Sequence, residues 1–461
     1  MADVAADVIV VGAGVTGCAV AAALADGRRR ILVLEARKGH KPRFAGEYIH
    51  PPGTQVLDNL GFLPALRARG GIDVDGFAVV KQQPLPPTLL PYREIPGGRP
   101  TGFAMEHREL VEGMRAEIVR RPGVELRLGH RVEEILRDGS GRACGVRTEH
   151  GPLRAPLVLG CDGRHSKVRP LLGLPEQARL VSFTVAVHLP EAAALLPHRG
   201  FGHIFLGAWG PILMYPVSAR DVRGCFDVSA DLSGGPAGAA RHIRDDYAGY
   251  LPPPLRAALL AALERERPQI AANESIRTDR SVAPGAAIVG DAGGCSHPLT
   301  ATGMTIGFLD AERLGRLLAP LPNLTDARAV DEALRRYEVE RYRFVRAREI
   351  LADALYEVFR AADPGTRAIR QGIFRYWQAG EGARARSMAL LSGAESRLGV
   401  FLREYMSVVG RSAGSALLGV EDGLPRRLTV PERGAALLGL GRKVWEKSRL
   451  VLRDVRQEAL R

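Results

Sequence analysis

The sequence Asp7-Val-Ile-Val-Val-Gly12-Ala-Gly14-Val-Thr-Gly17 contains an apolar run of strand length that leads into the pattern Gly-x-Gly-x-x-Gly. An alanine-rich, helix-forming segment follows, and a second apolar run, Ile31-Leu-Val-Leu-Glu35, ends in an acidic residue about twenty positions on. Strand, glycine turn, helix, strand and acid in this order predict a βαβ dinucleotide-binding unit within a Rossmann-like α/β fold. An ordinary glycine turn would not explain the second strand and its acid.

Each glycine of this motif has a separate physical task. Gly12 allows the tight turn, Gly14 lets backbone N–H groups approach a pyrophosphate at the helix N-terminus, and Gly17 lets helix and strand pack closely. Glu35 is placed to accept hydrogen bonds from ribose hydroxyls. We therefore predict that the cofactor is bound here by Gly12, Gly14, Val15, Thr16, Gly17, Glu35 and Ala36.

The composition is that of a soluble α/β enzyme. The chain has 461 residues, of which 46% are hydrophobic and 25% charged, enough for two or three domains with a sizeable core. The five cysteines are scattered and lack metal-ligand spacing, which indicates a reducing compartment and no metal site. No basic n-region precedes the first strand and no apolar run approaches about 18 residues, so we expect a cytoplasmic protein.

The net charge of +13 suggests an anionic partner. The arginines are dispersed, however, and no stacking or groove-reading motif accompanies them, so the sequence does not favour nucleic-acid binding. An anionic cofactor or an anionic membrane surface explains the charge better.

Three further segments carry polar residues suited to the same cofactor. A basic, glycine-containing loop from Arg37 to Gly53 offers Arg43 as a ligand for phosphate and ribityl oxygens. A buried strand that begins at Leu157 ends in Asp162-Gly163, and a later strand ends in Gly290-Asp291 before a helix that starts near Gly303. A helix N-terminus with an acid just before it can hold ribityl hydroxyls and isoalloxazine carbonyls together.

The middle of the chain has a different pattern. Short alternating strands over residues 182–228 predict a mixed or antiparallel sheet inserted into the first domain. An apolar substrate site would lie against this sheet, and its candidate wall residues are Phe205, Trp209, Leu213 and Tyr215.

The last part of the chain is helical. Residues 330–361 predict one long helix or a helical pair, and further helices follow. In the final segment, Val444, Val451, Val455 and Ala459 form an apolar stripe that basic residues surround, with Trp445 and Leu452 beside it. Such a helix either lies at a bilayer interface or packs against the protein with a solvated face.

The three cofactor segments, in this order, resemble the FAD-dependent aromatic hydroxylase superfamily, and within it the squalene monooxygenase (squalene epoxidase) family. The matching phrases include Gly46-Glu47-Tyr-Ile-His50-Pro51, Asp162-Gly163-Arg-His-Ser166 and Gly290-Asp291-Ala, and the resemblance continues into the C-terminal helices. It implies FAD as cofactor, with Arg43, Glu47, Arg108, Val132, Asp162, Gly163, Asp291, Pro298, Gly303 and Met304 among the residues that bind it.

The resemblance also implies a domain plan. The FAD-binding domain would comprise residues 1–75, 101–178 and 275–328, of the p-hydroxybenzoate hydroxylase type. A substrate-binding β-sheet domain would comprise residues 76–100 and 179–274, and a C-terminal helical region residues 329–461.

Two departures from the family pattern concern the active site. His50 stands where the family has glutamine, and the family's active-site tyrosine falls on Tyr92, so a Tyr–Gln pair near the flavin becomes Tyr92 and His50, our candidate catalytic residues. The family's Arg-His-Pro-Leu-Thr-Gly-Gly-Gly reads Ser296-His-Pro-Leu-Thr-Ala-Thr-Gly303. These changes leave the flavin chemistry intact and put the substrate in doubt.

The resemblance implies a monooxygenase that transfers one oxygen atom of O₂, through a flavin C4a-hydroperoxide, to a C=C bond of a squalene-like isoprenoid. One alternative is epoxidation or hydroxylation of a prenylated aromatic such as a quinolone or quinone. Others are reduction of isoprenoid double bonds and flavin binding without catalysis. Because no second Gly-x-Gly-x-x-Gly has strand context, NAD(P)H would act either at the flavin directly or through a separate reductase.

Overall fold

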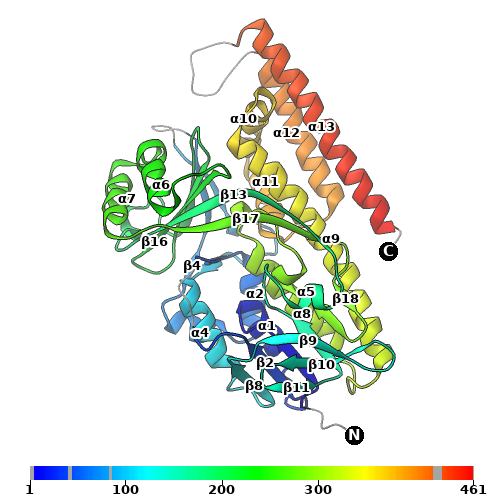
Figure 1. The fold of residues 1–461 in the computed structure, drawn as a ribbon. Helices are drawn as coiled ribbons and strands as arrows, with labels where there is room; N and C mark the ends of the chain where they lie inside the picture. The colour runs from blue at the N-terminus through cyan, green and yellow to red at the C-terminus, as the bar shows by residue number, and fades with distance from the viewer. Residues whose placement is uncertain (1–4, 40–43, 82–85, 419–427, 460–461) are drawn as a thin grey trace.

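The computed structural model describes residues 5–39, 44–81, 86–418 and 428–459. Figure 1 shows three connected parts: a Rossmann-like domain at the bottom that carries the N-terminus, a large sheet with two helices at the upper left, and a stack of helices at the upper right. The chain passes between the first two parts more than once before it enters the helices.

The Rossmann-like domain is built on a six-stranded sheet in the order β18-β19-β12-β1-β2-β8. The strands pair in parallel except for β18, which is antiparallel to β19. The strands are β1 (Val8–Val11), β2 (Ile31–Glu35), β8 (Val124–Leu128), β12 (Leu157–Gly160), β18 (Val282–Ala283) and β19 (Ala286–Ile288). Helices α1 (Val15–Leu24), α4 (His107–Ile118) and α8 (Gly303–Leu318) pack in its core.

Smaller elements complete this domain. An antiparallel sheet is formed by β9 (Val132–Arg137), β10 (Ala143–Thr148) and β11 (Gly151–Arg154). A second contains β3 (Tyr48–Ile49), β4 (Ile72–Val74) and β7 (Gly102–Ala104). The short helices are α2 (Pro51–Asn59), α3 (Leu63–Ala68) and α5 (Val168–Leu171).

The inserted sheet has seven strands in the order β17-β13-β16-β15-β14-β5-β6. All neighbours are antiparallel except β14 and β5. The strands are β5 (Gly76–Val80), β6 (Thr88–Pro91), β13 (Glu176–Leu189), β14 (Phe201–Leu206), β15 (Pro211–Pro216), β16 (Val222–Ser229) and β17 (Gln269–Thr278). The strand expected to start at Ser182 starts at Glu176, because its first half pairs with β17.

Residue alternation gives this sheet two different faces. Phe205, Ile212 and Phe226 point to one face and pack against α6 (Gly235–His242) and α7 (Pro253–Arg265). The opposite face carries Leu213, Tyr215, Cys225, Asp227, Thr184 and Asn273, and it faces the Rossmann-like domain and the C-terminal helices.

The C-terminal region consists of five helices. One continuous helix, α9 (Ala327–Arg360), runs from the Rossmann-like core at Tyr337 to the second core at Ile350, which settles the choice between one helix and a pair. It is followed by α10 (Pro364–Gln378), α11 (Glu381–Ser392), α12 (Leu398–Leu418) and α13 (Val430–Ala459). In the described part of the chain, none of these helices combines the length and apolar character needed to cross a bilayer.

Of the predicted α13 stripe, Val444 and Val451 face inward, whereas the side chains of Val455 and Ala459 lie outside the described residues. Val451 is buried and Val444 packs with it against the helical core, because α13 lies along α10 and α12. The outward side carries Leu438, Trp445 and Leu452 instead. Packing therefore accounts for the inward side of this helix, and the interfacial interpretation of its outward side stays a prediction.

Candidate active site

The glycine motif lies between β1 and α1, as predicted. Gly12 has φ +101°, and a Cβ atom there would lie 2.6 Å from the Cys161 carbonyl oxygen; a Cβ on Gly17 would overlap the Gly12 carbonyl. A Cβ on Gly14, by contrast, would have no neighbour within 4 Å. Gly12 and Gly17 are thus required by packing, whereas the open space at Gly14 is a cradle at the N-terminus of α1 that a ligand can fill.

Glu35 lies beside this cradle at the end of β2. Its Oε2 accepts hydrogen bonds from the Ala13 N–H and the Arg115 Nη2, both at 3.1 Å, and Ala36 follows it in the same loop. Arg115 Nε also donates to the Ala13 carbonyl at 2.7 Å. The sequence analysis missed Arg115, because an arginine in the last turn of a helix carries no motif.

Asp162 and Gly163 organise the turn that follows β12. Asp162 accepts hydrogen bonds from the Ser166 hydroxyl at 2.6 Å and from the backbone N–H groups of Lys167 and Val168. Gly163 has φ +82°, a conformation that favours glycine. The carboxylate is thereby committed to the turn beside the glycine motif.

The Gly290-Asp291 loop is held from behind by a buried ion pair. Asp310 accepts hydrogen bonds from the Gly290 N–H at 3.1 Å and from Arg341 Nε at 2.9 Å, and Arg341 Nη2 donates to the Gly290 carbonyl at 2.9 Å. Asp310 and Arg341 are both buried. The loop is therefore fixed by groups on α8 and α9 that leave its other side open.

The two cofactor patches meet where α1 packs on α8. A Cβ on Gly290 would lie 2.8 Å from Thr16 Oγ1, and one on Gly307 would overlap the same hydroxyl. Asp291 lies near the N-terminus of α8, since a Cβ on Gly303 would be 3.5 Å from its Oδ1. Residues about 280 positions apart in sequence thus border one continuous surface, the geometry expected at the carboxyl ends of parallel strands.

A cavity of about 200 Å³ lies between this surface and the inserted sheet. We call it the flavin cavity. Its Rossmann-side lining includes predicted cofactor residues, namely Glu47, Asp291, Pro298, Gly303 and Met304. Its sheet-side lining includes Leu213 and Tyr215, as predicted, together with Thr184, Asp227 and Asn273.

Three residues that were predicted to bind the cofactor have protein surroundings that do not by themselves indicate a cofactor contact. Glu47 is buried, and Arg223 on β16 binds its carboxylate through two hydrogen bonds of 2.8 and 2.9 Å, so it ties the loop to the sheet. The Arg108 side chain is 58% exposed and bonds to Glu112, and Val132, the first residue of β9, is buried in a hydrophobic core. Their contacts to a cofactor stay predictions. Arg43 lies outside the described residues.

The prediction that Phe205 and Trp209 form the wall of the substrate site was wrong. Phe205 points to the other face of the sheet because it pairs with Ile212, and it packs against α6 and α7. Trp209 lies in the turn after β14 and is 53% exposed. Alternation along a strand separates Phe205 from Leu213, but only the pairing register shows which face is the cavity.

The predicted pair of candidate catalytic residues is in direct contact. The Tyr92 hydroxyl donates to His50 Nδ1 at 2.6 Å, and His50 Nε2 donates to the Thr300 carbonyl at 2.7 Å. Both side chains are fully buried. Burial lowers the pKa of His50 to about 4 and raises that of Tyr92 well above its ordinary value, so the pair consists of a neutral imidazole and a neutral phenol.

A second, apolar cavity of about 100 Å³ is separated from this pair by Phe77, whose ring centroid lies 5.9 Å from that of His50 and 6.3 Å from that of Tyr92. We call it the apolar cavity. It lies between the inserted sheet and the C-terminal helices α9 to α12, and its lining includes Phe77, Leu351, Phe359, Trp377, Leu390 and Tyr405. Leu299 lines both the apolar cavity and the flavin cavity. The sequence analysis did not foresee this cavity in detail, although it expected an apolar site between sheet and helices.

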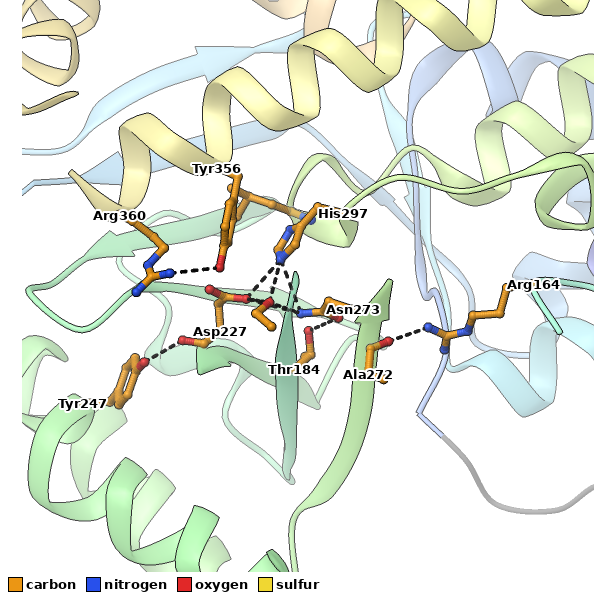
Figure 2. A network of polar contacts seen from close by, with 11 residues as sticks. Arg164, Thr184, Asp227, Tyr247, Ala272, Asn273, His297, Tyr356 and Arg360 are labelled. Carbon is orange, nitrogen blue, oxygen red and sulfur yellow. Dashed lines mark hydrogen bonds and ion pairs between the residues drawn. The ribbon is translucent and has the colours of Figure 1, made fainter. Parts of the chain in front are cut away.

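A buried polar network joins the sheet to the loop before α8 (Figure 2). His297 Nε2 donates to Ser182 Oγ at 2.9 Å and to Asp227 Oδ1 at 3.1 Å, while its Nδ1 accepts from the Leu299 N–H. The Ser182 hydroxyl donates to Asp227 Oδ1 at 2.5 Å, and Asn273 Nδ2 donates to Ser182 Oγ at 2.8 Å. The serine proton goes to the carboxylate and not to the imidazole, so this is not a nucleophilic triad.

The residues of the flavin cavity fit FAD. The open cradle at Gly14 accommodates a pyrophosphate, Glu35 is placed for ribose hydroxyls, and the N-terminus of α8 with Asp291 suits ribityl and isoalloxazine oxygens. The cavity between the Rossmann-like domain and the sheet is where the ring system would extend.

Comparison with known proteins agrees with this site. A profile of the squalene epoxidase family matches residues 154–423. The chain is 31% identical to the squalene epoxidase of Aspergillus fumigatus, over 81% of this chain and 79% of that protein, and 30% identical to squalene epoxidase 3 of Arabidopsis thaliana, over 99% and 85%.

Solved structures confirm the fold. The p-nitrophenol 4-monooxygenase of Pseudomonas putida superposes with a TM-score of 0.72 at 21% identity, over 84% of this chain and 98% of that one. PqsL of Pseudomonas aeruginosa, described as a probable FAD-dependent monooxygenase, superposes with a TM-score of 0.62 at 22% identity, over 83% of this chain and 99% of that one. The chain belongs to the squalene epoxidase family and is an FAD-dependent monooxygenase.

Proposed function

We propose that this enzyme epoxidises a C=C bond of a squalene-like isoprenoid. The observation that carries the proposal is the apolar cavity, which adjoins the flavin cavity at Leu299 and is separated from the Tyr92–His50 pair by Phe77. A long hydrocarbon needs such a lining along its length and one end that reaches the cofactor. Family membership supports the same substrate class.

Bound FAD would supply the redox chemistry, accepting electrons that originate from NAD(P)H and delivering one oxygen atom of O₂ to the double bond. The chain's own residues have simpler tasks. Tyr92 and His50 form a neutral, fully hydrogen-bonded pair that places no charge beside the hydrocarbon. The apolar lining excludes water, which would otherwise divert the oxygen to hydrogen peroxide.

The test is mass spectrometry of products after FAD-loaded protein receives a reductase, NADPH, O₂ and squalene. A gain of one oxygen supports the proposal, and two added hydrogens without oxygen would mean a reductase. Protein without reductase, and protein reduced under nitrogen, serve as controls.

A prenylated aromatic such as a quinolone or quinone is the second candidate substrate. The observation that favours it is the polar sheet wall of the flavin cavity, where Thr184, Asp227 and Asn273 could receive polar ring substituents. In a parallel assay, a gain of oxygen on the prenylated aromatic but not on squalene would identify the prenylated aromatic as the substrate.

We propose that electrons pass from NAD(P)H through a separate reductase. The sequence contains one Gly-x-Gly-x-x-Gly with strand context, and that motif forms the FAD cradle. The purified protein alone should therefore oxidise NADPH slowly, and a flavoprotein reductase should accelerate it. Rapid oxidation without a reductase would contradict this.

We also propose that α13 attaches the protein peripherally to an anionic membrane surface. Leu438, Trp445 and Leu452 are 79%, 61% and 59% exposed, and their spacing of seven residues places them on one side of the helix. Arg449 covers the Trp445 ring at 5.2 Å, and Arg442 is nearby in sequence. This apolar stripe with basic neighbours suits a bilayer interface.

Sedimentation with vesicles of phosphatidylserine and phosphatidylcholine tests this attachment. Trp445→Glu should lower the bound fraction, and Trp209→Glu, at the other largely exposed tryptophan, should not. Equal binding of both variants would assign α13 to packing alone.

A further inference from the structure

Leu299 lies on a short turn between the two cavities. The turn Pro298–Thr300 is a single 3₁₀ turn, and Leu299 at its centre lines both the flavin cavity and the apolar cavity. Among the described residues, no other side chain lines both. Where the substrate meets the cofactor therefore depends on where this turn lies.

The turn is held at both ends. At its C-terminal end, His50 donates to the Thr300 carbonyl at 2.7 Å, and Ala301 follows in a left-handed conformation with φ +51°. At its N-terminal end, the His297 ring accepts from the Leu299 N–H and donates to Ser182 and Asp227 on the sheet. A strained residue between two anchors persists only when its surroundings specify it.

We propose that Ser182, Asp227 and His297 form a polar latch that positions Leu299 as the partition between the flavin cavity and the apolar cavity. They are positioning residues, acting on oxygen transfer through Leu299. This inference rests on the proposed function for its substrate, but the latch itself is a property of the folded chain.

The pairing of the sheet strands indicates that the polar contacts of the latch are a specific arrangement and not an incidental one. A register shift between Leu180 and Ser182 in the pairing of β13 with β17 places Ser182 opposite Asn273. The regular pairing of β13 with β16 places Thr184 opposite Asp227, so that all four polar side chains share the cavity face. Bulges of this kind commonly re-aim side chains beside active sites. A purely structural joint between sheet and loop would be cheaper to build from apolar residues than from a buried carboxylate.

Tyr356 adds a third element to the latch. Its ring contacts the His297 ring, with centroids 4.2 Å apart and the planes tilted by 35°, and Arg360 lies within 3.5 Å of its hydroxyl (Figure 2). Residues of the Rossmann-like loop, the sheet and α9 thus meet at His297. Any shift among these three parts is transmitted to the Leu299 turn.

Asp227→Asn weakens the latch with the smallest change of shape, because a neutral amide oxygen accepts from Ser182 and His297 less strongly than a carboxylate does, and Tyr247→Phe is its matched control. The Tyr247 hydroxyl donates to the Asp227 main-chain carbonyl at 2.5 Å from the opposite side, as Figure 2 shows, so its loss removes a buried hydrogen bond at Asp227 without touching the latch. Both variants should lose stability, and Asp227→Asn alone should loosen the turn.

The first readout is hydrogen exchange of the peptide that spans residues 297–304, followed by mass spectrometry on the FAD-loaded protein. Exchange should be about tenfold faster in Asp227→Asn and unchanged in Tyr247→Phe. Equal exchange in wild type and Asp227→Asn would overturn the latch. This readout requires no turnover, so it decides the latch even if squalene proves not to be the substrate.

The second readout is the fraction of consumed O₂ released as hydrogen peroxide during turnover of squalene or, if squalene is not turned over, of the accepted substrate. Leu299→Ala should raise this fraction about threefold or more. Because Asp227 acts through Leu299, the double variant with Asp227→Asn and Leu299→Ala should release the same fraction of peroxide as Leu299→Ala alone. If the two substitutions raised the peroxide fraction independently, so that their effects multiplied in the double variant, the coupling between Asp227 and Leu299 would be overturned. Leu390→Ala, which alters only the apolar cavity, should raise KM without raising the peroxide fraction.

Discussion

His50→Gln should remove a large part of the acid sensitivity of this protein while keeping its active site. The imidazole is fully buried, and burial lowers its pKa from 6.5 to about 4. Because the folded pKa lies below the unfolded one, the unfolded chain binds the proton first as the pH falls. Stability from this group is complete above pH 6.5 and is lost as the pH falls toward 4.

The size of the effect follows from the two pKa values. At about 1.4 kcal/mol per pH unit, the free energy of unfolding should fall by about 2 kcal/mol between pH 7 and pH 5 because of His50 alone. His203, whose pKa burial also lowers to about 4, contributes equally to wild type and variant and cancels in the comparison.

Glutamine can replace both hydrogen bonds of the neutral ring. Its amide oxygen can accept from the Tyr92 hydroxyl and its NH₂ can donate to the Thr300 carbonyl, whereas alanine would leave both groups buried without partners. The family resemblance implies glutamine at this position. His50→Gln should therefore retain FAD and product formation, and His50→Ala should lose stability at every pH.

The assay is urea unfolding, followed by the release of FAD, at pH 7 and pH 5 for wild type and His50→Gln. The fall in stability between the two pH values should be about 2 kcal/mol smaller in the variant. An identical fall in both proteins would refute the argument that His50 is buried in its neutral form.

Three further predictions concern the cofactor site. Gly14→Val should abolish flavin retention by filling the open cradle, and a variant purified fully yellow would contradict the assignment. Ala301→Gly should raise the free energy of unfolding by about 0.5–1 kcal/mol, measured as a higher urea midpoint, because it relieves the left-handed strain; a lower midpoint would mean that no strain exists. Arg341→Met should cost about 3 kcal/mol or more in calorimetry and lower FAD content, since it leaves buried Asp310 without its main partner; unchanged FAD content would separate the ion pair from the cofactor loop.

Local patterns in the sequence were enough to place the cofactor cradle. The spacing of Gly12, Gly14 and Gly17 reports backbone contacts made within one βαβ unit, so neighbouring residues carry the whole signal. The Tyr92–His50 contact was also predicted, but from the family pattern and not from spacing. Forty-two positions separate the two residues, and no periodicity links them.

The residues that hold the cradle from outside could not be predicted. Arg115 and Arg341 lie within helices, where arginine is common on exposed faces, and only the packing of α4, α8 and α9 makes them partners of Ala13 and Gly290. The positions of Phe205 and Trp209 could not be predicted either. Their apolar character indicated burial, but it did not indicate on which face of the sheet a side chain would lie. Strand register and helix docking are long-range properties that a local pattern does not encode.

The sheet wall of the flavin cavity shows why substrate identity is the hardest step. One residue of bulge on β13 decides that Ser182, and not Val181, lies opposite Asn273, and Ser182 is a partner of His297. Relatives that share the glycine motif and the Gly290-Asp291 loop could differ here without changing how they bind FAD. The latch joins three separately folded parts at His297, so small differences in packing would move Leu299 and with it the position at which a double bond meets the flavin. We therefore expect the junction between the domains, more than the motifs that bind FAD, to set the substrate specificity of this enzyme.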